Sequence, residues 1–394
     1  MNIFYILIDS GVSFYYFNRF GGKYFADKGW KVKYIDTTYF TRKSSFYLMK
    51  YEDFHYENAE VIIAKSFEDI KVVLDENSRG IAILSLVANG FNEYKIKAAL
   101  KKHNIRFGMD KLGLKYYDFQ SEISKDLVKR TLFKKVFDSI EKNGWQKTIY
   151  LILSVLYQRF MFDDVYDFVL VIDQDRLKKY EPDFLANNFI ECHSWDYDEY
   201  LNMNDTEDGQ TNYVLWLDQN LPNHPEIIEE KLLSMGSKQY YLELNNLFDR
   251  IEKIYNVKVI IAGHPTSSVS LTSEKFRGRE VILYKTIHLI RDSNFIISHH
   301  TAALNFAILF RKQILFITND NFEENILGKY IEEFAQSLGQ TKMNISENVD
   351  KIELTSINDE LYDKYSKGNI SKYPENLIRN WDIFYKNYVE NKLK

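Results

Sequence analysis

The sequence contains one cysteine, Cys192, and only five prolines in 394 residues. A single cysteine excludes an internal disulfide, and it excludes any metal or iron–sulfur site built from several cysteines. It is also typical of a reducing compartment, so we expect a cytoplasmic protein. The scarcity of proline and the lack of Ser/Gly-rich or Gln-rich tracts argue against disordered arms and short repeats.

Long hydrophobic runs and an excess of one charge are also missing. The most apolar stretch, residues 148–162, is broken by Gln158 and Arg159, so the sequence predicts no membrane-spanning helix. The chain starts with a short apolar run that has no basic residues and ends at Asp9, which indicates a buried first strand rather than a signal peptide. Lys+Arg 51 nearly balance Asp+Glu 56, so nucleic acid is not an expected partner.

Short apolar runs alternate with amphipathic segments along the whole chain. Strands separated by helical segments indicate parallel βαβ units and an α/β fold, and the length favours two lobes because one domain usually has about 100–200 residues. We expect strands at Ile3–Asp9, Lys31–Asp36, Val61–Lys65, Ile81–Leu86, Phe168–Ile172, Phe189–Cys192, Tyr213–Leu217, Val257–Ala262, Val281–Tyr284, Phe295–Ile297 and Ile314–Ile317. We expect helices at Tyr16–Lys28, Glu68–Asn77, Asn92–His103, Ser237–Tyr255 and Thr301–Phe310.

A polar, turn-rich segment at residues 202–212 interrupts this pattern and predicts the linker between the lobes. We therefore predict an N-terminal Rossmann-like lobe at residues 1–203, with a helical insertion at about 121–160. A nucleotide-binding lobe follows at 212–373, and a final helix at 374–394 is expected to return towards the first lobe.

Polar residues follow three strands of the second lobe at the points where the strands end. These segments are Asp-Gln-Asn at 218–220, Gly-His-Pro-Thr-Ser-Ser at 263–268 and Ser-His-His-Thr at 298–301. Ligands of open parallel sheets bind beyond the carboxyl ends of the strands, and the third segment opens into a predicted helix whose free N–H groups suit a phosphate. We therefore assign donor and phosphate binding to Gln219, Gly263, His264, Pro265, Ser298, His299, His300 and Thr301.

Structural roles compete with these assignments. Ser298 and Thr301 could simply cap the following helix, and His264 could be a turn residue held by Pro265. A metal cluster of the histidines at 193, 264, 299 and 300 is disfavoured, because adjacent side chains diverge and no carboxylate lies at a ligand spacing. We expect neither a metal nor a cofactor.

The first lobe should supply the acceptor site and a general base. Asp9 is the preferred catalytic base because it follows the first strand, although helix capping is an equal alternative. Ser10 and Gly11 in the same loop, and His193 and Asp196 just before the linker, are the further candidates for acceptor binding.

The order of strand, Gly-His-Pro, and then strand, Ser-His-His-Thr, helix, strand resembles the His-Pro and Ser-Ser/Thr motifs of bacterial sialyltransferases and polysialyltransferases. The resemblance covers residues 213–318. It implies a GT-B fold, with two Rossmann-like lobes and an interlobe cleft, and an inverting, metal-independent sugar transfer in capsule or lipopolysaccharide biosynthesis. It further implies a CMP-linked nonulosonic acid as the donor, with His264 at the leaving phosphate and Ser298 and Thr301 beside it. The acidic motif of that family has no match in the first lobe, since Glu207-Asp208-Gly209 lies in the predicted linker.

Three other functions remain open. Polymerases that use CDP-glycerol also resemble the His-Pro plus Ser-Ser arrangement, and a non-hydrolysing sugar-nucleotide epimerase would have a similar two-lobed fold. A non-catalytic sugar-nucleotide-binding protein is the alternative from a different class. Activity assays with CMP-sugars and with CDP-polyols as donors would distinguish the enzyme hypotheses. Donor binding without turnover would indicate the non-catalytic alternative.

Residues 125–159 combine many lysines and arginines with large apolar side chains. Such a segment could lie on an anionic membrane at the inner face of the cytoplasmic membrane, where lipid-linked acceptors are found. The competing prediction is a helical insertion packed on the first lobe with a solvated charged face. The expected partners are thus a nucleotide-sugar donor and an oligosaccharide or lipid-linked glycan acceptor.

Overall fold

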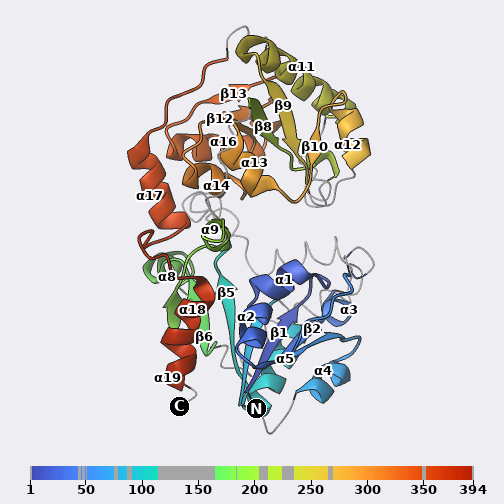
Figure 1. Cartoon of the computed structure of the whole chain (residues 1–394), viewed down its shortest axis with the longest axis vertical. Helices are drawn as coiled ribbons and strands as arrows, with labels where there is room; N and C mark the ends of the chain where they lie inside the picture. Colours follow the sequence, from blue (N-terminus) through green and yellow to red (C-terminus); the bar gives the residue numbers. More distant parts are fainter. Residues whose placement is uncertain are drawn as a thin grey trace, which may run out of the picture. The chain divides into compact units, whose positions relative to one another are not determined.

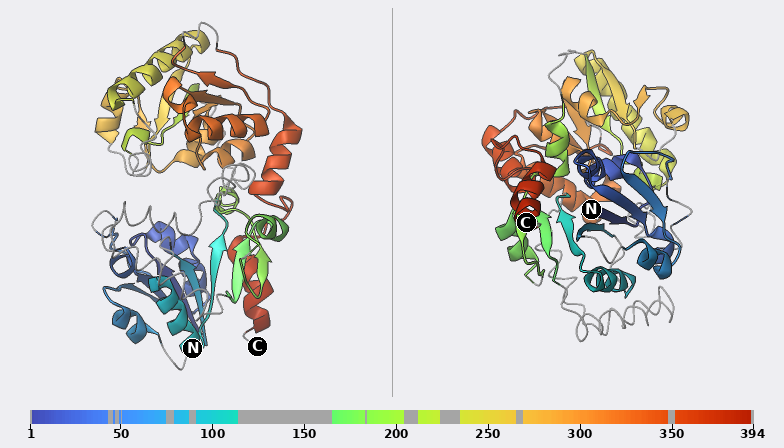
Figure 2. Two further views of the ribbon diagram at one scale, coloured as in Figure 1. Left: turned by 180° about the vertical axis from the view of Figure 1, so that it is seen from behind. Right: turned by 60° about the horizontal axis from the view of Figure 1, so that its bottom comes forward.

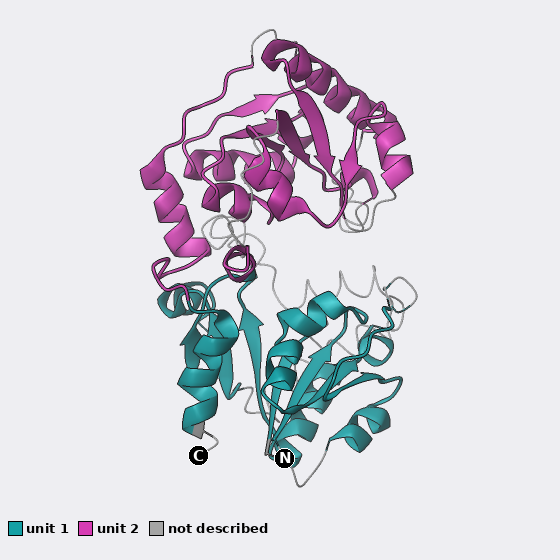
Figure 3. Ribbon diagram, in the orientation of Figure 1, with its two compact units in different colours: residues 1–195, 378–394 teal, residues 196–377 magenta. Residues whose placement is uncertain are grey.

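The computed structural model describes residues 2–42, 46, 49, 51–74, 79–86, 91–113, 165–182, 184–203, 212–223, 235–264, 269–347 and 352–392. The chain forms two compact units, one of residues 1–195 and 378–394 and the other of residues 196–377 (Figure 3). The predicted helical insertion at 121–160, the basic segment at 125–159 and the linker core at 204–211 lie outside the described residues.

The chain enters the second unit within helix α9 (Trp195–Tyr200), ahead of the polar segment that the sequence suggested. The indole N–H of Trp195 donates to Asp110 in the first unit at 2.8 Å, whereas Asp196 accepts from Asn305 in the second unit at 2.6 Å. The side chains of Trp195 and Asp196, on either side of the boundary between the units, are therefore both held by hydrogen bonds. This explains why the boundary falls in a helix and not in a turn-rich segment. The chain returns to the first unit at residue 378, four residues after the predicted start of the final helix.

The first unit is built on a seven-stranded sheet with the order β3-β2-β1-β4-β5-β6-β7, in which every pair is parallel (Figure 1). The chain winds from the centre to one edge and then to the other, as in a Rossmann-like fold. The strands are β1 (Asn2–Ile8), β2 (Lys31–Asp36), β3 (Ala59–Ile63), β4 (Arg79–Ser85), β5 (Arg106–Lys111), β6 (Phe168–Val171) and β7 (Phe189–Glu191).

Both faces of this sheet are covered at its centre, so β1 is apolar on both sides. Phe4, Ile6 and Ile8 of β1 belong to one hydrophobic cluster, and the alternating residues Tyr5 and Leu7 belong to another. The helices of this unit are α1 (Phe14–Arg19), α2 (Gly22–Asp27), α3 (Thr38–Thr41), α4 (Phe67–Val73), α5 (Phe91–Lys102) and α8 (Gln174–Tyr180). The predicted helix at 16–28 is thus two helices, because Gly21 adopts a left-handed conformation with φ 86° between them.

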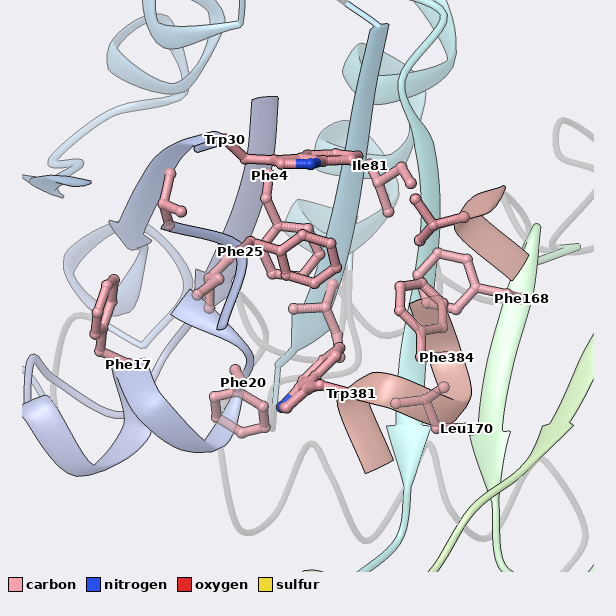
Figure 4. Close-up of a cluster of buried hydrophobic side chains, with 14 of the residues drawn as sticks. Phe4, Phe17, Phe20, Phe25, Trp30, Ile81, Phe168, Leu170, Trp381 and Phe384 are labelled. Carbon is pink, nitrogen blue, oxygen red and sulfur yellow. The ribbon is translucent and has the colours of Figure 1, made fainter. Parts of the chain in front are cut away.

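The C-terminal segment completes the core of the first unit. It comprises α18 (Asn380–Phe384), the π-helical turn η3 (Tyr385–Val389) and α19 (Glu390–Lys392). Figure 4 shows Trp381 and Phe384 pointing into the cluster, where Trp381 lies edge-on to Phe25 at 5.8 Å between ring centroids and Phe384 meets Phe168 at 4.8 Å. Residues more than 200 positions apart in the sequence thus share one core.

The second unit repeats the doubly wound plan with a parallel six-stranded sheet in the order β10-β9-β8-β11-β12-β13. Helices α11 and α12 cover one face, and α13, α14 and α16 cover the other (Figures 1 and 2). The strands are β8 (Tyr213–Leu217), β9 (Lys258–Ala262), β10 (Val281–Ile282), β11 (Ile296–Ser298), β12 (Ile314–Thr318) and β13 (Lys342–Asn344). The helices are η2 (Leu221–Asn223), α11 (Ser237–Tyr255), α12 (Val269–Lys275), α13 (Thr286–Asp292), α14 (Leu304–Leu309), α15 (Asp320–Glu323), α16 (Ile326–Ser337) and α17 (Asp359–Asn369).

The fold class predicted from the sequence, α/β with two Rossmann-like units, is confirmed by these two parallel sheets. No described helix combines the length and the apolar character needed to cross a membrane.

Candidate functional site

The carboxyl ends of β8, β9 and β11 meet at the centre of the second unit's sheet. From β8 the chain winds through β9 to β10 on one side, and then returns to build β11, β12 and β13 on the other. The strand order therefore reverses between β8 and β11, and such a switch point opens a crevice at the carboxyl ends of the strands. All the sequence-predicted donor residues that the structure describes lie at or directly after these three strand ends.

Gln219, just beyond β8, is hydrogen-bonded to the segment that follows β11. Its Nε2 donates to the backbone carbonyl of His300, and its Oε1 accepts from the backbone N–H of His300 at 3.3 Å. A single side-chain amide thus mimics a strand-to-strand pairing where the regular ladder has ended. It fixes the position of the segment after β11 relative to the end of β8.

Asp218, the preceding residue, reaches the segment that follows β9. Its Oδ1 accepts from the backbone N–H of Asn220 at 3.1 Å, and the backbone N–H of His264 lies near enough to favour the charged carboxylate. Burial raises the pKa of the Asp218 carboxyl, and these two N–H groups oppose that rise. The indole N–H of Trp216 also favours the charged form, although it lies outside hydrogen-bond geometry. Asp218 belongs to the polar Asp-Gln-Asn run at the end of β8, but no role was predicted for it from the sequence.

His264 is half-buried, directly after a glycine that the packing requires. A Cβ on Gly263 would lie 2.7 Å from Leu283 and 2.9 Å from Val281, and the Gly263 N–H donates to the Ile282 carbonyl at 3.0 Å. Gly263 therefore lets β9 and β10 approach closely, and it places His264 at the carboxyl end of the strands. Pro265 lies outside the described residues.

His299 turns into the core instead of towards the crevice. It is 1% exposed, its Nδ1 lies 2.7 Å from the Ile317 carbonyl, and its Nε2 lies 3.1 Å from the Tyr240 hydroxyl. A carbonyl only accepts, so Nδ1 carries the proton and Nε2 of the neutral ring accepts from Tyr240. Burial lowers the pKa of His299 to about 4, which keeps the ring neutral. The His299 side chain therefore has a structural role at the end of β11, because both of its ring nitrogens are already hydrogen-bonded in the core.

This buried imidazole predicts acid sensitivity. A histidine with a pKa near 6.5 in the unfolded chain and about 4 when folded contributes about 3 kcal/mol of stability. Since the folded pKa is depressed, this stability is present above about pH 6.5 and is lost as the pH falls towards 4. Urea unfolding across that range should show a His299→Gln variant that is less stable at neutral pH but has a flatter pH dependence than the wild type.

The exposed His288 on α13 provides the control for that experiment. His288→Ala should retain the wild-type pH dependence. An equal slope in His299→Gln and in the wild type would contradict the assignment of a neutral, core-bonded ring to His299.

His300 and Ser298 lie on either side of His299 and occupy different environments. The His300 ring stacks on Tyr330 of α16 at 5.7 Å between ring centroids, and burial lowers its pKa to about 4. The Ser298 hydroxyl is fully buried, and the described residues offer it no hydrogen-bond partner. The backbone of this segment, rather than the imidazole of His300, therefore faces Gln219.

The predicted helix start at Thr301 is wrong by three residues, because α14 begins at Leu304 and has only six residues. A tight turn precedes it, in which the N–H groups of Leu304, Asn305 and Phe306 donate to the carbonyls three residues earlier. These groups are thus satisfied, and a phosphate-binding helix terminus of the expected kind does not form here. The Thr301 hydroxyl accepts from the Ala303 N–H at 3.4 Å and stabilises the turn.

In the first unit, Asp9, Ser10 and Gly11 follow β1, as the sequence predicted. The capping alternative for Asp9 does not hold, since Ser13 caps α1 by accepting from the Tyr16 N–H at 3.2 Å. Asp9 is fully buried, and Gly11 has a φ of 82°, a conformation that favours glycine.

A second buried carboxylate, Asp36, follows the neighbouring strand β2. Its oxygens accept from the Thr38 hydroxyl at 2.5 Å and the Tyr51 hydroxyl at 3.1 Å, and the Thr38 hydroxyl accepts from the Gly11 N–H at 3.3 Å. Burial raises the pKa of Asp36. Its place at a strand end is the only sign of Asp36 in the sequence, and sequence reasoning missed this buried polar residue of the first unit.

His193 and Asp196, predicted together as acceptor residues, belong to different units. His193 is 3% exposed, and its backbone N–H and carbonyl pair with the side-chain amide of Asn380 at 2.8 and 3.0 Å. Asp196 accepts from Asn305, which in turn accepts from Tyr365. Both residues thus make contacts that anchor helices.

Among the described residues, no three His, Cys, Asp or Glu side chains are arranged to hold a metal ion. Both ring nitrogens of His299 bond within the core, so this histidine is not open to the metal cluster that was considered from the sequence.

Comparison with known proteins shows similarity at the level of structure. No protein-family model and no curated protein sequence matches the chain. S. aureus MnaA in complex with UDP is 10% identical, with a TM-score of 0.49 over 99% of this chain and 97% of its own. CalG4, the calicheamicin glycosyltransferase, is 11% identical, with a TM-score of 0.45 over 87% and 86% of the two chains. UDP-GlcNAc 2-epimerase from Neisseria meningitidis bound to UDP-GlcNAc is 12% identical, with a TM-score of 0.44 over 99% and 100%.

These similarities concern the fold and transfer no residue role to this chain. The three proteins include no sialyltransferase, so the resemblance to that family stays a prediction.

Proposed function

We propose that the protein is a glycosyltransferase that binds the nucleotide part of a nucleotide-sugar donor at the carboxyl ends of β8, β9 and β11. The observation that supports this is the joining of three strand ends at the switch point. Gln219 holds the backbone at His300, and the backbone N–H of Asp218 donates to the carbonyl of Ala262 at the end of β9 at 3.1 Å. Polar groups from three separate segments thus surround the place where sheets of this topology take up ligands.

In the proposed reaction, the bond between the sugar and the donor phosphate breaks and the acceptor hydroxyl forms the new bond. The nucleotide leaves with the bonding electron pair, and its phosphate gains negative charge. His264 donates a hydrogen bond to that phosphate, which stabilises the charge as it develops. The acceptor proton passes to a carboxylate of the first unit, for which Asp9 remains the prediction. No metal is required by this scheme.

The finer proposal comes from the sequence motifs alone. It is an inverting transfer of a CMP-linked nonulosonic acid to an oligosaccharide or lipid-linked glycan in surface-polysaccharide biosynthesis, at the inner face of the cytoplasmic membrane. Polymer phosphotransfer from CDP-glycerol and sugar-nucleotide epimerisation remain outcomes of the tests below.

A thermal-shift panel tests the nucleotide site. A nucleotide present at 100 times its Kd should stabilise the fold by about 2.7 kcal/mol, which corresponds to roughly 5–10 °C in the melting temperature of a unit this size. CMP, CDP, UDP and GDP are compared, with inorganic phosphate as the control. UDP-N-acetylglucosamine is added because it occurs in a solved structure of similar fold. If none of these ligands shifts the melting temperature, the proposal fails.

The next measurement separates transfer from epimerisation. A transferase releases free nucleotide in proportion to acceptor glycosylation, whereas an epimerase interconverts the sugar nucleotide without an acceptor. Binding without either reaction, across a panel of glycan acceptors, would favour a non-catalytic binding protein.

A further inference from the structure

The two residues that end the central strand of the second unit extend in opposite directions. The backbone N–H of Asp218 donates to the Ala262 carbonyl at the end of β9 at 3.1 Å, and its carboxylate is stabilised by the nearby N–H of His264. Gln219 instead pairs with the backbone of His300, beyond β11. Each of these two residues interacts with the main chain of a neighbouring segment. Each therefore positions that segment independently of the segment's own side chains. Neither residue duplicates the contact of the other.

We propose that Asp218 and Gln219 are positioning residues, which hold the His264 and His300 segments in the arrangement that binds the donor nucleotide. This inference rests on the proposed function and deepens it, because it assigns the geometry of the site to residues that do not perform the chemistry.

The chemistry of each side chain suits its role. Among uncharged side chains, a primary amide can donate to a carbonyl and accept from an N–H at the same time, which is what the His300 backbone requires of Gln219. A carboxylate in that place would repel the carbonyl oxygen. At Asp218 the nearby backbone N–H groups of Asn220 and His264 both favour the negative charge, and a carboxylate attracts such donors more strongly than an amide does.

The opposite end of β8 has a matched arrangement that serves as the control. Asn212 precedes β8, donates to the carbonyl of Asn256 before β9 at 3.1 Å, and accepts from the amide of Asn294 before β11 at 3.1 Å. It is thus another amide that links the same three strands, but at the amino edge, where sheets of this topology bind no ligand. Loss of Asn212 measures the purely structural cost of such a link.

The experiment compares Gln219→Ala, Asp218→Asn and Asn212→Ala in the full chain. The readouts are the melting temperature, the Kd for the nucleotide with the largest thermal shift, and KM and kcat for the matching sugar nucleotide. Losing one hydrogen bond worth about 1.4 kcal/mol corresponds to about a tenfold change. Gln219→Ala should raise Kd and KM about tenfold with little effect on kcat, because the segment after β11 is displaced. Asp218→Asn should instead lower kcat about tenfold, because His264 shifts from the departing phosphate.

Asn212→Ala should leave Kd, KM and kcat within about twofold of the wild type, with a melting temperature lowered as much as in Gln219→Ala. If Gln219→Ala does not fold, Gln219→Glu replaces it, since it keeps the size and the acceptor oxygen but loses the donor to the His300 carbonyl.

The outcomes are distinguishable. If the wild-type protein binds none of the nucleotides, the proposed function fails and the inference fails with it. If the wild type binds nucleotide but the Gln219 and Asp218 variants behave as Asn212→Ala does, the inference is overturned while the proposed function stands.

Discussion

Replacing His264 with alanine is expected to lower the turnover of the sugar-nucleotide donor about 100- to 1000-fold. The expectation follows from the place of His264 at the carboxyl end of β9, where it is half-buried and its backbone N–H lies near the Asp218 carboxylate. A donor aimed at charge that develops in the transition state typically contributes about 3–4 kcal/mol, which is this change in rate. The free nucleotide should lose less than about tenfold in affinity, since the interaction strengthens as the phosphate departs.

The measurement is kcat for donor consumption, together with Kd for the nucleotide, in purified protein that melts as the wild type does. His264→Asn, which retains a hydrogen-bond donor, should recover part of the loss. His288→Ala removes an exposed histidine from α13 of the same unit and should be fully active. Near-normal turnover in His264→Ala would refute the role proposed for this imidazole.

Trp381→Ala should lower the free energy of unfolding of the first unit by about 3–5 kcal/mol, the usual cost of removing a large buried aromatic side chain. Trp381 is 4% exposed, lies edge-on to Phe4 and Phe25, and donates its indole N–H to the Arg19 carbonyl at 3.0 Å. A Cβ on Gly21 would lie 2.8 Å from its ring, so the turn between α1 and α2 is shaped around it.

Urea unfolding monitored by probes placed in each unit would measure this effect. The transition of the first unit should move to lower urea, and the transition of the second unit should stay in place, because Trp381 belongs to the first unit's core. Trp381→Phe, which keeps an aromatic ring but loses the hydrogen bond, should cost less. A loss below about 1 kcal/mol in Trp381→Ala would show that the C-terminal segment is not part of that core.

The sequence predicted the bounds of buried, apolar helices and strands more accurately than those of polar strands. The strands expected at 31–36 and 213–217 and the helix expected at 237–255 have the observed bounds, since each has a clear apolar pattern. Two strands were missed, β5 and β13. Their sequences, RFGMDK and KMN, are polar, and pairing with a neighbouring strand makes them part of the sheets.

At the candidate site, the sequence identified the strand ends but not the direction of the side chains there. His299 and His300 are adjacent, yet one bonds inside the core and the other stacks on Tyr330. Asp218 and Asp36 gained their buried environments only from neighbouring strands and loops. Short motifs cannot encode such contacts, because the partners are supplied by segments distant in the chain.

The sequence by itself determined that this protein is an α/β chain whose second half carries polar groups at successive strand ends, because apolar periodicity and strand-end polarity are local properties of the chain. Only the tertiary structure decided which strands are neighbours. It also decided that the crossing between units falls at residues 195–196, that His299 is a core residue, and that α14 starts beyond Thr301. These features depend on hydrogen bonds and packing between segments tens to hundreds of residues apart. The free energy of such contacts cannot be deduced from any single stretch of sequence, because each stretch contains only one of the partners.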